Sequence, residues 1–146
     1  GMEPIRISQI NYSLAHSSVE TFGDNTLVCM DTKEFRWYKK HDFPVMAFSP
    51  QAKGFFAKLA KGDAANNLPE GQYAGPANLA RLAKVKQLSE QTGDTPAKIT
   101  LGYLNSQPFF VSSVFAVTKL WQLDEDMEAQ DLTYDPKTVA FLENMI

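Results

Sequence analysis

The chain has 146 residues, 44% of them hydrophobic and 21% charged, and a formal net charge of -3. This length and composition are typical of one folded domain and exclude a disordered chain. The weak negative charge argues against a nucleic-acid-binding surface. No apolar run approaches the roughly 20 residues that cross a membrane, and no secretory signal is recognisable. We therefore predict one cytoplasmic domain over residues 2–146, with neither nucleic acid nor membrane as partner.

Three segments are predicted as strands. Residues 5–13 alternate between two faces, which is a strand pattern. Gln9 and Asn11 share the face of Ile5 and Ile7. Residues 44–48 are continuously apolar, as in a sheet covered on both faces. Residues 110–116 form the third predicted strand.

Helical patterns separate and follow these strands. Asp31, with Glu34 three residues later, predicts the start of a helix over 32–41. Residues 60–78 are rich in Gly, Asn and Pro and predict a mobile loop, after which Asn78 is expected to cap a helix. That helix carries an apolar stripe and stops at Gly93.

Three more helices are expected towards the C-terminus. Thr95 is a good cap, with Pro96 at the first helical position, for a largely buried helix over 97–107. Helical patterns also occupy residues 119–130 and the segment after Asp135. Strands that alternate with helices imply parallel pairing through right-handed crossovers, and three such strands leave two open sheet edges.

Five segments of the sequence resemble the C-terminal half of the aldo/keto reductases, and they agree with that family in order and spacing. They are "SQINYSLAH", "VMAFSPQAKGFF", the long stretch from Leu79 to Phe109, "QLDEDMEAQDL" and "DPKTVAFLEN". The resemblance implies an α/β fold that is a partial (β/α)8 TIM barrel. It would contain about three parallel strands, barrel strands six to eight, with flanking helices, and its cofactor would be NADP.

The resemblance also implies where the cofactor would lie. Barrel enzymes place their sites at the C-terminal ends of the strands, often with a phosphate site after strands seven and eight. The loop after the second predicted strand would then lie against the cofactor pyrophosphate, because small residues let the backbone approach closely. Its residues are Ser49, Pro50, Gln51, Ala52 and Gly54. Without the resemblance, the same loop could be an ordinary surface turn.

Five further residues are assigned by the resemblance alone. Gln9 would hydrogen-bond the nicotinamide carboxamide, and Phe48 would stack on the nicotinamide ring. Glu125 and Asp126 stand for a Glu-Asn pair near the adenine, with Asp in place of the asparagine, and Lys119 would supply positive charge for the adenosine phosphate. Considered without the family, Phe48 is typical of a core residue and Gln9 of a polar strand residue. The acidic run 124–128 is typical of a solvated helix face.

The catalytic Asp, Tyr, Lys and His of the family lie on its first four strands, and these strands have no counterpart in this sequence. No other catalytic constellation and no metal-binding motif is present. We therefore expect a protein of NADP-dependent oxidoreductase lineage that keeps part of the cofactor site and is inactive alone. The alternative is a non-catalytic nucleotide-binding or interaction module that self-associates through open sheet edges. The expected partner is a second copy, most simply in a dimer, or a complementary N-terminal half-barrel.

Overall fold

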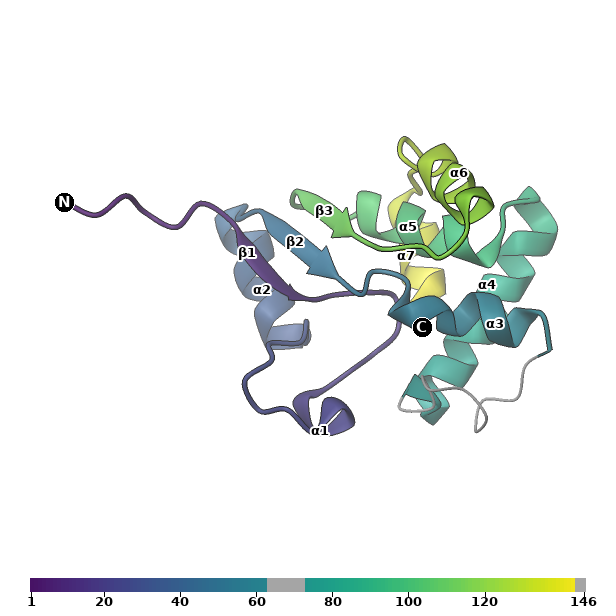
Figure 1. Cartoon of the computed structure of the whole chain (residues 1–146), viewed down its shortest axis with the longest axis horizontal. Helices are drawn as coiled ribbons and strands as arrows, with labels where there is room; N and C mark the ends of the chain where they lie inside the picture. The colour runs from purple at the N-terminus through teal and green to yellow at the C-terminus, as the bar shows by residue number, and fades with distance from the viewer. Residues whose placement is uncertain (63–72, 144–146) are drawn as a thin grey trace.

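A computed structural model describes residues 1–62 and 73–143 and contains one three-stranded sheet (Figure 1). The strands are β1 (Ser8–Asn11), β2 (Val45–Phe48) and β3 (Val111–Val114), in the spatial order β1-β2-β3. Both pairs are parallel, with Ser8 opposite Val45 and Val45 opposite Val111. The predicted α/β class and the three parallel strands are confirmed, although each strand is shorter than the sequence pattern indicated.

Seven α-helices accompany the sheet in the described part of the chain. They are α1 (Val19–Phe22), α2 (Thr32–His41), α3 (Phe55–Ala60), α4 (Pro76–Thr92), α5 (Pro96–Asn105), α6 (Leu120–Glu128) and α7 (Pro136–Leu142), and a 3-10 turn, η1 (Ala52–Gly54), precedes α3. None of these described helices combines the length and the apolar composition that a bilayer crossing requires. The short helices α1 and α3 were not predicted, because neither is long enough to show a helical period.

Most of the predicted helix ends are confirmed. The Asp31 carboxylate accepts a 2.8 Å hydrogen bond from the Glu34 backbone N–H, and Thr95 accepts from the Lys98 N–H at the start of α5. Gly93 ends α4 with φ of 80°, a left-handed conformation that glycine adopts without steric cost. Each of these signals acts over a few neighbouring residues.

The cap predicted at Asn78 is wrong. Helix α4 begins at Pro76, after Gly75, because proline is suited to the first helical position. Asn78 is instead buried, and its side chain pairs with both the N–H and the C=O of His16, at 2.7 and 2.9 Å. It also donates to the Tyr73 carbonyl at 2.9 Å, so this one amide links α4 to the segment after β1.

The loop predicted over residues 60–78 is also wrong at both ends. Helix α3 includes Ala60, and α4 already contains Pro76. Residues 63–72 of this prediction lie outside the described residues. In α4 the predicted apolar stripe is buried at Val85 and Leu88, whereas Leu79 is exposed.

The core lies on one face of the sheet. Ile10, Val45 and Ala47 point towards the helices and are buried, and Figure 1 shows α2 and α5 on that side. Met46 and Phe48 point to the opposite face and are only half-buried. The expectation that β2 is covered on both faces is therefore wrong for the described residues: one face of the sheet is open.

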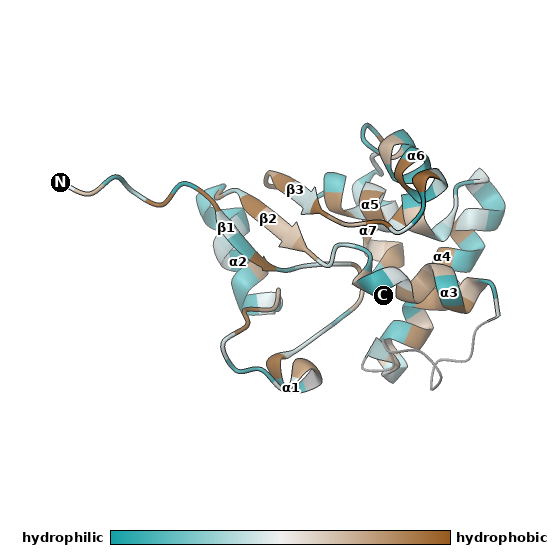
Figure 2. Cartoon of the chain, viewed as in Figure 1, coloured by the Kyte–Doolittle hydropathy of each residue, from teal (hydrophilic) through white to brown (hydrophobic). Residues whose placement is uncertain are grey.

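The two edges of the sheet differ. At the end of β1 the Asn11 N–H donates to the Val28 carbonyl at 2.9 Å, and the Asn11 carbonyl accepts from the Met30 N–H at 2.8 Å. Within residues 1–62 and 73–143, nothing pairs with the outer edge of β3. Figure 2 shows apolar residues at the start of β3 and on α6, and several of the largest are exposed. The β3 edge is therefore the more open of the two.

Candidate functional site

A cleft of about 690 Å³ lies where β2 and β3 end. Parallel strands bring their carboxyl ends to the same edge of a sheet, which is the usual place for ligands in α/β proteins. Three regions form its walls: the loop after β2 with α3, the start of α5, and the segment from β3 into α6. The loop and α3 contribute Ser49, Pro50, Gln51, Lys53, Gly54, Phe56, Ala57, Lys58 and Lys61. The other walls are formed by Pro96, Ala97 and Thr100, by residues 114–118, and by Trp121, Gln122, Glu125 and Asp126.

The loop after β2 has an unusual backbone. Ser49, Ala52 and Lys53 have φ of 53°, 49° and 56°, and Gly54 has φ of 80°. Left-handed φ is uncommon for residues other than glycine and stores strain that surrounding contacts must offset. Two short main-chain bonds close the loop, from the Ala52 N–H to the Ser49 carbonyl and from the Gly54 N–H to the Gln51 carbonyl, both 2.9 Å. Such strained turns are concentrated at ligand sites.

A side-chain hydrogen bond ties this loop to α6. Gln51 Nε2 donates to Asp126 Oδ1 at 2.7 Å. Asp126 is only 5% exposed, so the expectation that the whole acidic run is a solvated helix face is wrong at this residue. Burial raises the pKa of the Asp126 carboxyl above its ordinary value, the Gln51 hydrogen bond lowers the pKa, and the Glu125 charge raises it again. The loop and α6 therefore meet through a buried acid.

The walls of the cleft carry opposite charges. The side formed by the loop and α3 carries Lys53, Lys58 and Lys61. The side formed by α6 carries the carboxylates of Glu125 and Asp126. The Lys61 ammonium lies 5.2 Å from the centre of the Trp121 ring, which is within the range of a cation–π contact. The cleft thus offers cations and a strained loop on one wall and an aromatic ring with acceptors on the other.

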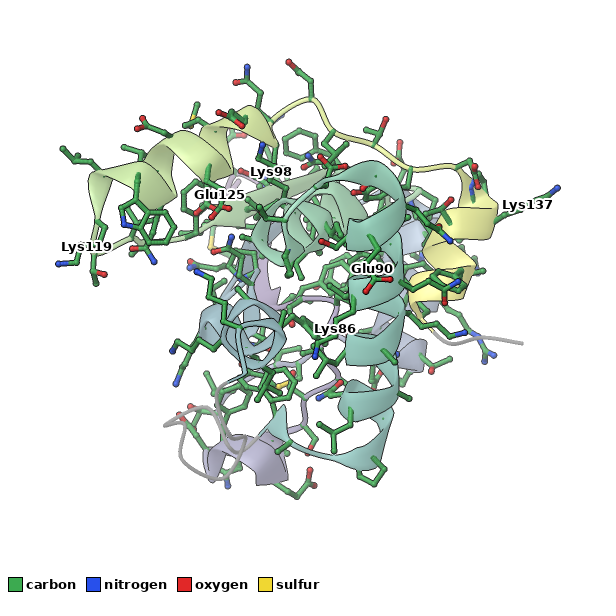
Figure 3. All side chains as sticks on the ribbon, turned by 90° about the vertical axis from the view of Figure 1, so that its right-hand side faces the viewer. Lys86, Glu90, Lys98, Lys119, Glu125 and Lys137 are labelled. Carbon is green, nitrogen blue, oxygen red and sulfur yellow. The ribbon has the colours of Figure 1, made fainter. Side chains whose placement is uncertain are left out.

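Two of the candidate residues, Lys119 and Glu125, lie on different sides of α6. Gln122 Oε1 accepts from the backbone N–H groups of Thr118 and Lys119, at 3.1 and 3.0 Å, and so caps the helix. Figure 3 shows Lys119 projecting away from the molecule, and this residue is not part of the cleft lining. Glu125 lies on the side of α6 that faces α5 (Figure 3).

The fold brings together six of the ten site residues that the resemblance suggested. The six residues that line the cleft are Ser49, Pro50, Gln51, Gly54, Glu125 and Asp126. Ala52 is fully buried in the loop. Gln9 and Phe48 lie outside the cleft on neighbouring strands, where both point to the open face of the sheet.

Several lining residues had no assigned role in the sequence. Pro96, Ala97 and Thr100 belong to a helix whose cap and apolar pattern indicate only a buried element, and no local feature connects them with the loop more than 40 residues earlier. Trp121 is exposed, and no local sequence feature connects it with the loop either. Among the described residues, no group of three or more His, Cys, Asp or Glu side chains is placed to hold a metal ion.

Comparison with known proteins identifies the family. The model of the aldo/keto reductase family matches residues 4–146. The chain belongs to the aldo/keto reductase family. The resemblance seen in the sequence is thereby confirmed.

Solved aldo-keto reductases have the same fold. The structure of a thermostable aldo-keto reductase, Tm1743, in complex with the inhibitor epalrestat matches with a TM-score of 0.63 and 15% identity, over 97% of this chain and 40% of that chain. An aldo/keto reductase from Klebsiella pneumoniae in complex with NADP and acetate gives 0.58 and 16%, over 95% and 38%. One from the same organism in complex with NADPH gives 0.60 and 18%, over 94% and 38%.

The coverage shows how much of the aldo/keto reductase fold is present. The chain spans about 40% of the length of the solved structures it matches. Its three parallel strands with flanking helices are therefore a partial (β/α)8 barrel, as expected from the sequence. At 15–18% identity these matches show the fold and do not by themselves assign the site.

Proposed function

We propose that the cleft binds the diphosphate and adenosine part of a nicotinamide dinucleotide, NADP(H) by resemblance, and that this chain supplies one part of a reductase site. The observation that carries the proposal is the strained loop Ser49–Gly54 at the carboxyl ends of β2 and β3. Three lysines line the same wall of the cleft as this loop. Phosphates are bound by backbone N–H groups in such turns and by nearby cations. The two Klebsiella pneumoniae relatives carry NADP or NADPH, which supports this choice of ligand.

The residues present fit such a ligand in two parts. The cleft, at about 690 Å³, is within the usual range for small-molecule sites and can hold the adenosine beside Trp121. From the loop, the other half of the dinucleotide would extend over the open face of the sheet, where Phe48 offers a ring face and Gln9 an amide. When bound, the nicotinamide ring would supply a hydride, which is the chemistry of the cofactor and not of the protein.

We also propose that the chain alone does not reduce carbonyl compounds. In the family a tyrosine, tuned by a lysine, protonates the carbonyl as hydride arrives, and the segments that carry both have no match in this sequence. The chain's own residues would bind and orient the nucleotide. We therefore expect no oxidation of NADPH with a panel of aldehydes, measured by the cofactor absorbance. Turnover that survives repurification would contradict this.

Titration calorimetry at low salt tests the binding proposal. We expect NADPH to bind with a dissociation constant weaker than about 1 μM, because a site that lacks several hydrogen bonds, each about 1 kcal/mol, loses orders of magnitude in affinity. Lys61→Ala removes a cation from the cleft and should weaken binding several-fold, whereas Lys33→Ala, an exposed lysine at the start of α2, is the matched control. No binding at millimolar nucleotide, or equal affinities of the two variants, would refute the proposal.

A second candidate function is self-association, and the exposed surface beside the open β3 edge favours it. Phe110, directly before β3, and Val114, within β3, are exposed, and so are Leu120, Leu123 and Met127 of α6. Exposed apolar residues of this size mark interaction surfaces where they form one patch, and we propose that these residues do so. The partner would be a second copy of the chain or a complementary N-terminal half-barrel.

A further inference from the structure

Asp126 contacts the loop and not open solvent. Of the two acids that line the cleft from α6, Glu125 is partly exposed, whereas Asp126 is buried and its Oδ1 is engaged by Gln51 Nε2 at 2.7 Å. A hydrogen bond to an ionised acceptor is roughly twice as strong as one between neutral groups. One of the two carboxylate oxygens of Asp126 is therefore already engaged by the protein.

Besides its two main-chain bonds and the buried Pro50 and Ala52, the loop depends on one side-chain contact with α6. Gln51 is the residue that precedes η1, yet its side chain does not cap that turn and reaches to α6 instead. Gly54, which precedes α3, has no side chain to offer. Within the described residues, one side-chain hydrogen bond joins the loop 49–54 to another element, and it is the bond from Gln51 to Asp126. Strained backbone persists only where its surroundings over-determine it, so this contact matters for the left-handed residues beside it.

We propose that Asp126 is a positioning residue, which holds the loop Ser49–Gly54 in its strained conformation through Gln51 and does not itself contact the bound nucleotide. This inference rests on the proposed function, since it assigns how the phosphate-binding conformation is maintained. The family resemblance had suggested a direct contact between residue 126 and the adenine. The geometry gives the residue a different partner, on the loop.

Two substitutions at this position separate the roles. Asp126→Asn keeps an oxygen that accepts from Gln51 and removes the charge, whereas Asp126→Leu keeps a similar volume and removes the acceptor. A positioning role predicts that the loop keeps its strained conformation in Asp126→Asn and loses it in Asp126→Leu. Gln51→Leu removes the donor from the other side and should reproduce the effect of Asp126→Leu. The double variant, Gln51→Leu with Asp126→Leu, should lose no more loop protection than either single variant, because both substitutions remove the same interaction.

The readout is hydrogen exchange of the Ala52 and Gly54 backbone amides, which donate within the loop. It needs no nucleotide. We expect exchange about tenfold faster in Asp126→Leu and Gln51→Leu, the size of effect that losing one charge-assisted hydrogen bond produces. Asp126→Asn keeps a neutral acceptor for Gln51, so its exchange rate should lie between those of the natural chain and Asp126→Leu. Asp124→Leu, at an exposed acid of the same helix outside the cleft, is the matched control and should exchange like the natural chain.

Nucleotide affinity is the second readout and should follow the same order. Unchanged loop exchange in Gln51→Leu would overturn the proposal, as would loss of protection in Asp126→Asn equal to that in Asp126→Leu. If Asp126→Leu does not fold, Gln51→Leu carries the test, because Gln51 is only half-buried. If the natural chain binds no nucleotide, the proposed function fails, while the exchange result still decides whether Asp126 holds the loop.

Discussion

At the scale of single residues, Asp126 is a buried acid whose environment disfavours its charge. Burial raises the pKa of its carboxyl, and the hydrogen bond from Gln51 only partly opposes this. A group whose pKa is higher in the folded than in the unfolded chain stabilises the fold fully below its unfolded pKa. That contribution is lost as the pH rises through the folded pKa. The ionised form is therefore the costly one.

This argument predicts the effect of Asp126→Asn on stability. At pH 7 the variant should be more stable than the natural chain, because it keeps the acceptor for Gln51 without the buried charge. The difference should shrink as the pH falls towards about 4, the range in which ordinary aspartates titrate. Thermal unfolding between pH 4 and 8 measures it, with Asp124→Asn as the exposed control. Equal stability at all pH values would contradict the argument.

Gly102 is a second residue whose surroundings fix its identity. A Cβ atom at this position of α5 would lie 2.9 Å from Leu132 Cγ and 2.9 Å from Tyr134 Cε2. We expect Gly102→Ala to destabilise the fold by up to about 2 kcal/mol. The overpacking cost of about 1–3 kcal/mol outweighs a gain in helix propensity of about 1 kcal/mol. Urea unfolding measures this. Gly75→Ala, where nothing lies within 4 Å, should change stability by less than half as much.

At the scale of elements, α6 presents its polar side inwards and its apolar side outwards. Gln122, Glu125 and Asp126 face the cleft, whereas Leu120, Leu123 and Met127 are exposed. A surface helix normally buries its apolar stripe. The helix contacts the loop through Asp126 and α5 through an ion pair between Lys98 and Glu128, and its apolar side is exposed.

The end of α4 provides a prediction at the same scale. Gly93 has φ of 80° in the cap of this helix, with no atom near the position that a Cβ would take. The cost of a substitution there is therefore one of backbone conformation and not of space. Gly93→Ala should lower the free energy of unfolding by about 1 kcal/mol, and Gly93→Asn by less, because asparagine tolerates the left-handed region better. Urea unfolding measures this as a lower midpoint without a change of slope. Equal stability of Gly93→Ala and Gly93→Asn would contradict the prediction.

At the scale of the whole molecule, the sheet in the described part of the chain has one open face, an unpaired edge at β3 and an edge at β1 that is paired only at Asn11. The end of β1 is covered by its contacts with residues 28–30, but the outer edge of β3 has no partner strand within the described residues. Apolar side chains left in water forgo about 1.5–3 kcal/mol each, which is large against a total stability of about 5–15 kcal/mol. Closed twofold symmetry is the common way to cover such a surface.

We therefore expect a homodimer at micromolar concentration when the chain is studied alone, with an interface that includes β3 and α6. Val114→Lys and Leu123→Lys place charges in that surface and should shift the chain to a monomer. Leu79→Lys, at an exposed leucine of α4, should not. Light scattering coupled to size exclusion measures the mass. A stable monomer of the natural chain would show that the edge needs no second copy.

Local patterns in the sequence determined much of this architecture. The cap at Asp31, the stop at Gly93 and the apolar run of β2 depend on residues within one or two turns of each other, so their physics can be read from neighbours. The site residues of the loop 49–54 were suggested by family resemblance, and the fold does place most of them in one cleft.

Only the tertiary structure decided the environments of the polar residues. Asn78 was expected at a helix cap and is buried against His16. Asp126 was assigned near the adenine by resemblance, and to a solvated helix face without it, and is buried against Gln51. The start of α5 forms a wall of the cleft without any local sign of it. These outcomes depend on contacts between residues as far as 75 positions apart, as for Gln51 and Asp126. Burial and hydrogen-bond partners are set by what packs against a side chain, and local sequence does not contain that information.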